Sequence, residues 1–123
     1  MTAKKTILII DDDSRNIFAL SAVLKAKGYQ TIAASSAQEG IKILLNDKSI
    51  QAVLMDIMMP DMDGYEAIAQ IRSIEQLAGL FVIAVTAQAM VGDKEKTIEA
   101  GADEYVSKPI DVDALLKYLQ KAN

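Results

Sequence analysis

The chain has 123 residues, of which 51% are apolar and 24% charged, and this length and balance indicate one soluble globular domain spanning residues 1–123. It contains no cysteine and no histidine, which excludes disulfides, thiol nucleophiles, zinc–thiolate sites, Ser-His triads and imidazole metal ligands, so a bound metal must have oxygen ligands. The net charge of −4 argues against binding nucleic acid through the bare surface, and no apolar run reaches the roughly 18 residues of a membrane span.

The first predicted strand is the apolar run TILII, residues 6–10. A continuous apolar run of this length is typical of a strand covered on both faces. No small-residue cleavage site follows the run, so we interpret the N-terminus as a strand rather than a signal peptide and expect a cytoplasmic protein. Ser14 can cap a helix that ends at Gly28. One face of this helix carries Ile17, Leu20, Val23 and Leu24.

The middle of the chain repeats the alternation of strand and helix. YQTIAA (29–34) predicts the second strand and AVLMD (52–56) the third. Ser36 and Asp63 each precede a glutamate by three residues, a capping-box pattern that predicts a helix after each strand. The first of these two helices runs through Ile41, Leu44 and Leu45, and the second should turn Tyr65, Ile68 and Ile71 inward.

The last third of the chain adds two more pairs of strand and helix. LFVIAVT (80–86) predicts the fourth strand, and a short helix follows over residues 92–100. EYVS (104–107) predicts the fifth strand, and Asp111 caps a final helix. The core side of that helix carries Leu115, Leu116 and Leu119.

Five strands that alternate with five helices predict an α/β fold. Such strands are parallel and joined by right-handed crossovers, with helices on both faces of the sheet. We expect the flavodoxin-like, doubly wound (βα)5 arrangement with strand order 2-1-3-4-5. In such sheets, ligands bind outside the carboxyl ends of the strands where the strand order reverses. The crevice should therefore lie beside the first and third strands.

Polar side chains follow four of the predicted strands. Asp11 and Asp12 follow the first, Asp56 ends the third, Thr86 ends the fourth and Lys108 follows the fifth. Because the carboxyl ends of parallel strands lie at one edge of the sheet, these five side chains should converge. Taken singly, each has an ordinary explanation as a turn residue, helix cap or solvated charge. Their shared position is the argument for a site.

The chemistry of this group points to phosphoryl transfer. Clustered carboxylates repel one another, and a hard divalent cation such as Mg²⁺ removes that conflict while keeping positions open for phosphate oxygens. Lys108 and Thr86 can contact two phosphoryl oxygens. Asp56, between them, is the candidate nucleophile for an acyl phosphate. Asp13, by contrast, is explained as a turn residue or a helix cap.

Four segments carry a resemblance to a known family. ILIIDDD (7–13), VLMDIMMPDMDG (53–64), IAVTA (83–87) and GADEYVSKP (101–109) occur in this order and spacing in the receiver domains of two-component response regulators. The resemblance runs from the first strand to the last helix. The chain is therefore identified as a member of that family.

The resemblance implies a role for each site residue. Asp56 matches the phosphoacceptor, which receives a phosphoryl group from a phosphohistidine on a histidine kinase or a histidine phosphotransfer protein. Thr86 and Lys108 match the two phosphoryl-contacting side chains, and Tyr105 matches the aromatic switch. The Lys108–Pro109 bond should be cis. The ligands of Mg²⁺, for which Mn²⁺ is an alternative, are Asp11, Asp12, Asp56 and the backbone carbonyl of Met58.

The resemblance also implies how the domain signals. Phosphorylation shifts a two-state arrangement of Thr86, Tyr105 and the fourth helix, and a downstream protein reads the face made by the fourth helix, fifth strand and fifth helix. The resemblance implies no turnover of a separate substrate, so we expect that the chain is not an enzyme. Residues 14–28 resemble the first helix of receivers attached to hybrid histidine kinases, which points to a phosphorelay or hybrid-kinase origin, and a stand-alone receiver stays an open alternative.

Two alternatives stay open. One is a degenerate receiver that acts as a phosphorylation-independent interaction module. The other is a phosphatase of the haloacid dehalogenase type, which also uses an aspartyl phosphate and magnesium but needs a second aspartate two residues after the nucleophile. Met58 occupies that position here. In receivers, this position and the one now held by Gln88 tune hydrolysis, so Met58, which cannot position a water, predicts slow self-dephosphorylation.

Overall fold

The computed structural model describes residues 5–57, 64–86 and 92–121. Five strands form one sheet: β1 (Thr6–Ile10), β2 (Gln30–Ala34), β3 (Ile50–Asp56), β4 (Phe81–Thr86) and β5 (Glu104–Ser107). The helices are α1 (Ser14–Ala26), α2 (Ala37–Asn46), α3 (Gly64–Ser73), α4 (Asp93–Ala100) and α5 (Val112–Gln120), with a 3₁₀ turn, η1 (Glu75–Leu77), before β4. In this part of the chain, no helix has the length and apolar character needed to cross a membrane.

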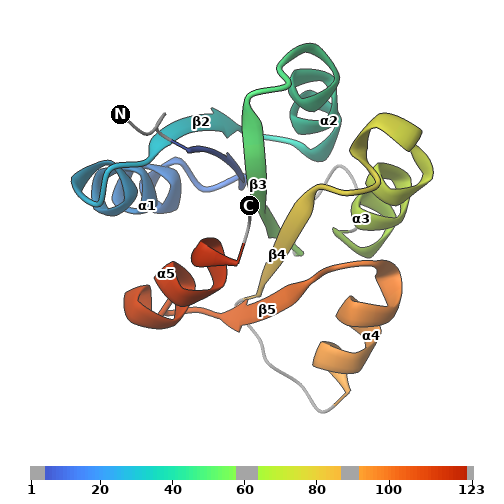
Figure 1. Ribbon diagram of the computed structural model, residues 1–123. Helices are drawn as coiled ribbons and strands as arrows, with labels where there is room; N and C mark the ends of the chain where they lie inside the picture. Colours follow the sequence, from blue (N-terminus) through green and yellow to red (C-terminus); the bar gives the residue numbers. More distant parts are fainter. Residues whose placement is uncertain (1–4, 58–63, 87–91, 122–123) are drawn as a thin grey trace.

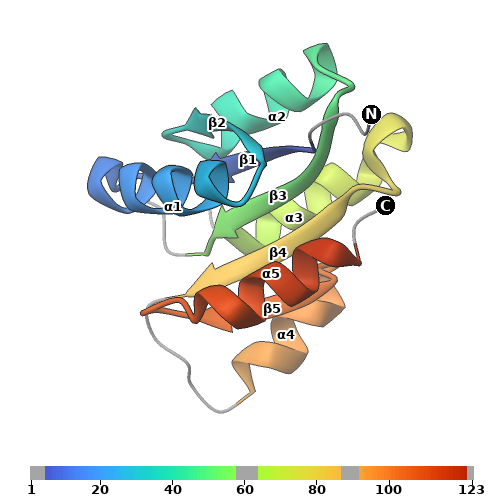
Figure 2. The ribbon, with the colours of Figure 1, turned by 60° about the vertical axis from the view of Figure 1, so that its left-hand side comes forward.

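The sheet is parallel throughout and has the order β2-β1-β3-β4-β5, which confirms the predicted fold. Helices α1 and α5 cover one face, and α2, α3 and α4 lie on the other (Figure 1). Figure 2 shows the arrowheads of β3 and β4 pointing to the same edge. The strand order reverses between β1 and β3, so the crevice expected for a ligand lies at the carboxyl ends of these two strands.

Alternating side chains of the central strands build a core on each face of the sheet. Leu8 and Ile10 pack toward α2 and α3, whereas Ile7 and Ile9 pack toward α1 and α5. All four are almost fully buried. Burial on both sides explains why β1 is a continuous apolar run rather than an alternating one. The core thereby fixes the strand ends on which the charged residues stand.

Two of the predicted helix caps are confirmed and one is wrong, whereas Asp63, the predicted cap of α3, lies outside the described residues. Ser36 accepts a hydrogen bond from the backbone N–H of Glu39 at 3.2 Å, and Asp111 caps α5 in the same manner. Helix α1, however, is capped by Asp13, whose carboxylate accepts from the N–H of Arg15 at 2.9 Å. The prediction of Ser14 as the cap was wrong, because the helix begins with Ser14 itself and Asp13 has the extended backbone that a cap requires.

At the opposite edge of the sheet, Arg72 of α3 joins several backbone segments. Its Nε donates to the carbonyl of Gly101 at 2.8 Å, and its Nη1 donates to the carbonyls of Ala78, at 3.0 Å, and Leu80. Its Nη2 lies 2.8 Å from the carboxylate of Asp103. We call these five residues the Arg72 clamp. It ties α3 to the segments that enter β4 and β5.

Candidate functional site

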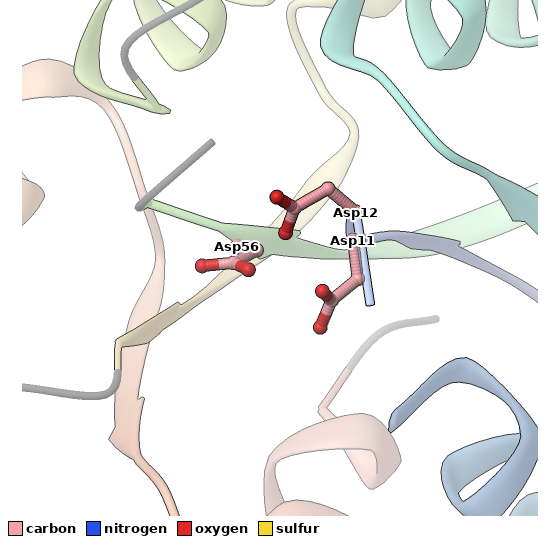
Figure 3. A group of neighbouring side chains, drawn as sticks. All are labelled: Asp11, Asp12 and Asp56. Atoms are coloured by element: carbon pink, nitrogen blue, oxygen red, sulfur yellow. The ribbon is translucent and has the colours of Figure 1, made fainter. Parts of the chain in front are cut away.

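The three predicted carboxylates converge at the carboxyl ends of β1 and β3. One oxygen each from Asp11, Asp12 and Asp56 can be chosen so that all lie within 4.8 Å of one another. Figure 3 shows the three side chains grouped at these strand ends, with the carboxyl groups of Asp11 and Asp12 turned in different directions. Asp11 is 2% exposed and Asp56 4% exposed, whereas Asp12 is open to solvent. Two of the three carboxylates are therefore held in a poorly solvated place, which is costly without a positive partner.

Backbone pairing in the sheet sets the positions of Asp11 and Asp56. The N–H of Asp11 donates to the carbonyl of Ala34 at 3.1 Å, which continues the β1–β2 ladder by one residue. Asp56 is the last residue of β3 and lies opposite Val85 of β4. The N–H of the following residue, Ile57, donates to the carbonyl of Val85 at 2.9 Å. Both carboxylates thus stand on hydrogen-bonded backbone rather than on free loops.

Lys108 supplies the positive partner. Its ammonium lies 3.4 Å from Oδ2 of Asp11 and 3.5 Å from Oδ2 of Asp56. The backbone N–H of Lys108 donates to the carbonyl of Thr86 at 2.7 Å, which places the segment after β5 beside the end of β4. The Lys108–Pro109 bond is cis, as the resemblance implied. Thr86 is 3% exposed, so its side chain is enclosed at the same edge.

The electrostatics of Lys108 reflect this placement. Burial of the ammonium is the largest single influence and opposes its charge, but the attraction of Asp56 and then of Asp11, with their hydrogen bonds, outweighs it. The pKa of Lys108 is raised above its ordinary value as a result. The side chain is therefore a fixed cation at neutral pH, shared between two carboxylates.

The donor set fits a hard divalent cation. One ammonium does not balance three carboxylates, so the group retains a net negative charge that attracts a cation. All the available ligand atoms are oxygens, which suits Mg²⁺, Mn²⁺ or Ca²⁺ and excludes a site built for soft metals. Asp11, Asp12 and Asp56 are the side chains that would hold the ion. The predicted carbonyl ligand, Met58, lies outside the described residues, as does Gln88.

The start of α3 closes tightly on the end of β3. The N–H of Gly64 donates to the carbonyl of Ile57 at 3.1 Å. A Cβ at Gly64 would lie 2.5 Å from the Cα of Ile57, closer than real contacts permit. Only glycine allows the helix to approach the backbone next to Asp56 this closely.

Tyr105, the predicted switch residue, lies on β5 opposite Ala84. Its side chain is half-buried and packs against the core on the α2–α3 side of the sheet. Tyr105 therefore lies on the strand next to that of Thr86, and its role as a switch stays a prediction.

The sequence did not predict one contact of the site. Asn16, in the first turns of α1, donates a hydrogen bond from its side-chain amide to Oδ2 of Asp11. The backbone N–H of Asp13 donates to Oδ1 of the same carboxylate at 2.9 Å. An asparagine near the start of a helix is common for many reasons, so only the fold shows that it turns back to the strand end.

Comparison with known proteins agrees with this geometry. Residues 7–120 match the family described as the response regulator receiver domain. The polar-differentiation response regulator DivK of Brucella ovis is 34% identical over 116 residues, which cover 94% of each chain.

Two solved structures show the same likeness in three dimensions. The receiver domain of the sensor histidine kinase PA1611 from Pseudomonas aeruginosa, which has a magnesium ion coordinated in its active-site cleft, is 31% identical with a TM-score of 0.88, and 98% of each chain is covered. A CheY-like receiver domain protein from Methanospirillum hungatei is 31% identical with a TM-score of 0.86, and 97% of this chain and 93% of that one are covered. The chain belongs to the response regulator receiver domain family of two-component systems.

Proposed function

We propose that this chain, as one receiver domain over residues 1–123, accepts a phosphoryl group on Asp56 from a phosphohistidine of a histidine kinase or histidine phosphotransfer protein. The observation that carries the proposal is the placement of Asp56. It lies in one group with Asp11 and Asp12, and the ammonium of Lys108 is 3.5 Å from its carboxylate. A nucleophile, a cation-binding pair and a fixed positive charge are the parts that phosphoryl transfer needs.

The chain's own residues divide the work of the reaction. A carboxylate oxygen of Asp56 forms a bond to phosphorus while the bond from phosphorus to the donor's imidazole nitrogen breaks. Asp11 and Asp12, with Asp56, would hold Mg²⁺, or Mn²⁺ as an alternative, which when bound offsets the negative charge of the phosphoryl oxygens. Lys108 offsets the same charge from the other side, and Thr86 donates a hydrogen bond to a phosphoryl oxygen.

We propose that the output of this reaction is conformational. A phosphoryl group on Asp56 draws Lys108 and Thr86 toward it and biases a two-state arrangement that includes Tyr105 and α4. The face of α4, β5 and α5 then binds a downstream protein. No turnover of a separate substrate is expected, and the cytoplasmic location expected from the sequence stays a prediction.

The relatives support these assignments by analogy. A magnesium ion lies in the active-site cleft of the receiver domain of PA1611, which comes from a sensor histidine kinase. That source agrees with the resemblance of residues 14–28 to receivers of hybrid kinases. DivK, by contrast, is named as a response regulator, so a response regulator and a kinase-attached receiver both remain candidates for the protein's place in a phosphorelay.

Intact-protein mass measured after incubation with acetyl phosphate tests the proposal. The native chain should gain one phosphoryl group in the presence of Mg²⁺ and none in EDTA. Asp56→Asn should gain none under either condition. Asp47→Asn is the matched control, because Asp47 follows α2 and precedes β3 at the end of the strand opposite Asp56, and it should gain one group as the native chain does.

Two outcomes would contradict the proposal. Equal labelling of Asp56→Asn and the native chain would show that another residue is the acceptor. A folded native chain that binds Mg²⁺ but gains no phosphoryl group would favour the phosphorylation-independent interaction module instead.

The lifetime of the acyl phosphate is a further expectation. Met58 and Gln88, which lie outside the described residues, occupy the positions that tune hydrolysis in the family. Because an apolar Met58 cannot orient a water for attack, the phosphoryl group should be lost slowly. Replacing Met58 by Asn should shorten the half-life several-fold in the same mass measurement, and an unchanged half-life would contradict this expectation.

A further inference from the structure

The carboxylate of Asp11 is oriented from both of its oxygens. Oδ1 accepts the backbone N–H of Asp13 at 2.9 Å. Oδ2 accepts the side-chain amide of Asn16 and lies 3.4 Å from the ammonium of Lys108. These donors come from the β1–α1 turn, helix α1 and the segment after β5, so three separate parts of the fold meet on one buried carboxylate.

The two side chains on Oδ2 of Asp11 differ in what they do to its charge. Lys108 neutralises it, and Lys108 is also shared with Asp56, 3.5 Å away. Asn16 is neutral, so its amide holds the oxygen in place and leaves the negative charge available to a cation. The amide nitrogen must face the carboxylate, because an amide oxygen turned toward it would be repelled.

Asn16 thus holds Asp11 in a way that does not depend on Lys108. In the proposed function the ammonium moves toward a phosphoryl group on Asp56, and Asp11 would then lose its charged partner and keep its amide partner. Hydrogen bonds to the free oxygens of metal-binding carboxylates fix their direction, and their loss weakens metal binding by about 10- to 100-fold in other proteins.

We propose that Asn16 is a positioning residue for the cation site, which aims the Asp11 carboxylate at the bound divalent ion. The inference rests on the proposed function only in taking Mg²⁺ as that ion. Because Asn16 belongs to α1, the position of this helix on the sheet would affect the orientation of Asp11 and so the affinity for the cation. A change in α1 would therefore alter the site without touching a metal ligand.

The test compares Asn16→Leu, which keeps the size of the side chain and removes its amide, with the native chain. Mg²⁺ affinity is measured calorimetrically on the unphosphorylated protein, so no phosphodonor is involved. Asn16→Leu should raise the dissociation constant about tenfold. Ser21→Ala, a neutral change further along α1, should leave it within twofold.

A second readout separates positioning from a merely structural role. The Mg²⁺ concentration that gives half-maximal phosphorylation should rise by the same factor, while the rate at saturating Mg²⁺ stays within twofold of the native rate. If Asn16→Leu does not fold, Asn16→Ser is measured against the same criteria, with a smaller shift expected because its hydroxyl is a shorter donor.

The inference is overturned if the Mg²⁺ dissociation constant of the folded variant stays within twofold of the native value, or if only the saturated rate falls. It is also overturned if the native chain binds no Mg²⁺. A native chain that binds Mg²⁺ but takes no phosphoryl group would contradict the proposed function and leave the inference on Asn16 intact.

Discussion

At the amino ends of β4 and β5, one arginine meets one carboxylate and three backbone carbonyl oxygens. At the carboxyl ends of β1 and β3, one lysine faces a group of three carboxylates. Charged groups therefore gather at both ends of the strands. In the Arg72 clamp the hydrogen-bond donors match the acceptors, whereas in the site the carboxylates outnumber the ammonium. A matched cluster contributes to stability, whereas a cluster with excess charge of one sign is poised to bind something else.

The geometry of the Arg72 clamp explains how complete the match is. Arg72 donates from Nε, Nη1 and Nη2, and the carboxylate oxygen of Asp103 that it contacts also accepts the backbone N–H of Val82 at 2.8 Å. In the site, by contrast, the ammonium of Lys108 lies 3.4 and 3.5 Å from its two carboxylates, at the long end of ion-pair contact. The Lys108 ammonium is therefore held less tightly than the Arg72 guanidinium, which leaves it able to move toward a ligand of the site.

The largest expected effect is the loss of the Arg72 clamp. Arg72→Met should lower the free energy of unfolding by about 3 kcal/mol, because three carbonyls and a carboxylate lose a charged donor. Urea unfolding followed by circular dichroism measures it. Arg15→Met is the matched control, since Arg15 is a 92% exposed side chain in a surface ion pair, and it should change stability by less than about 0.5 kcal/mol. Similar losses in the two variants would refute the role given to the clamp.

The same substitution should have opposite effects at the two edges. Without metal, Asp56→Asn should raise the free energy of unfolding by about 1–2 kcal/mol, because it relieves repulsion between two buried carboxylates that share a single ammonium. Asp103→Asn should lower it by about 1 kcal/mol, because the charge-assisted bond from Arg72 is lost. Both are measured in EDTA by urea unfolding. If Asp56→Asn is as destabilising as Asp103→Asn, the site carries no excess repulsion and the contrast between the edges fails.

Most of the fold and the convergence of the charged site residues could be predicted from the sequence. Apolar runs predicted every strand and each α-helix of the described residues, because burial on both faces leaves a strong pattern. The sheet order followed from the doubly wound arrangement expected for such an alternation. The convergence of Asp11, Asp56, Thr86 and Lys108 followed from parallel strands alone. The sequence predicted the ends of strands and helices less well. Strand β3 begins at Ile50 rather than at residue 52, and the 3₁₀ turn η1 was not predicted.

Contacts that depend on tertiary approach could not be predicted. Arg72 and Asp103 are 31 positions apart, and nothing in their local sequence links them. Asn16 likewise reaches Asp11 only because α1 packs back against the sheet. The choice between Ser14 and Asp13 as a cap was open because adjacent residues of both types suit that position, and the backbone angles decide between them.

The stability gained from bound Mg²⁺ should depend on the carboxylates at the carboxyl ends of the strands and not on the Arg72 clamp. At a free Mg²⁺ concentration ten times its dissociation constant, the native chain should gain about 1.4 kcal/mol of unfolding free energy by mass action. Arg72→Met should keep this increment, because the clamp lies at the other edge, whereas Asp12→Asn should lose most of it. Thermal unfolding with and without Mg²⁺ measures the increment, and its survival in Asp12→Asn would remove Asp12 from the cation site.

The smallest effect concerns a carboxylate that has only local partners. The hydroxyl of Ser49 and its backbone N–H, at 2.9 Å, hydrogen-bond to the exposed carboxylate of Asp47 and lower its pKa below the ordinary 3.8. A carboxylate whose pKa is lower in the folded chain stabilises it at pH values above its unfolded pKa, and this contribution is lost as the pH falls through the folded pKa. Asp47→Asn should therefore narrow the stability difference between pH 6 and pH 3 slightly, with Ser49→Ala doing the same. An equal narrowing in the control Asp113→Asn would show that general surface charge, rather than the Ser49 contacts, causes the effect.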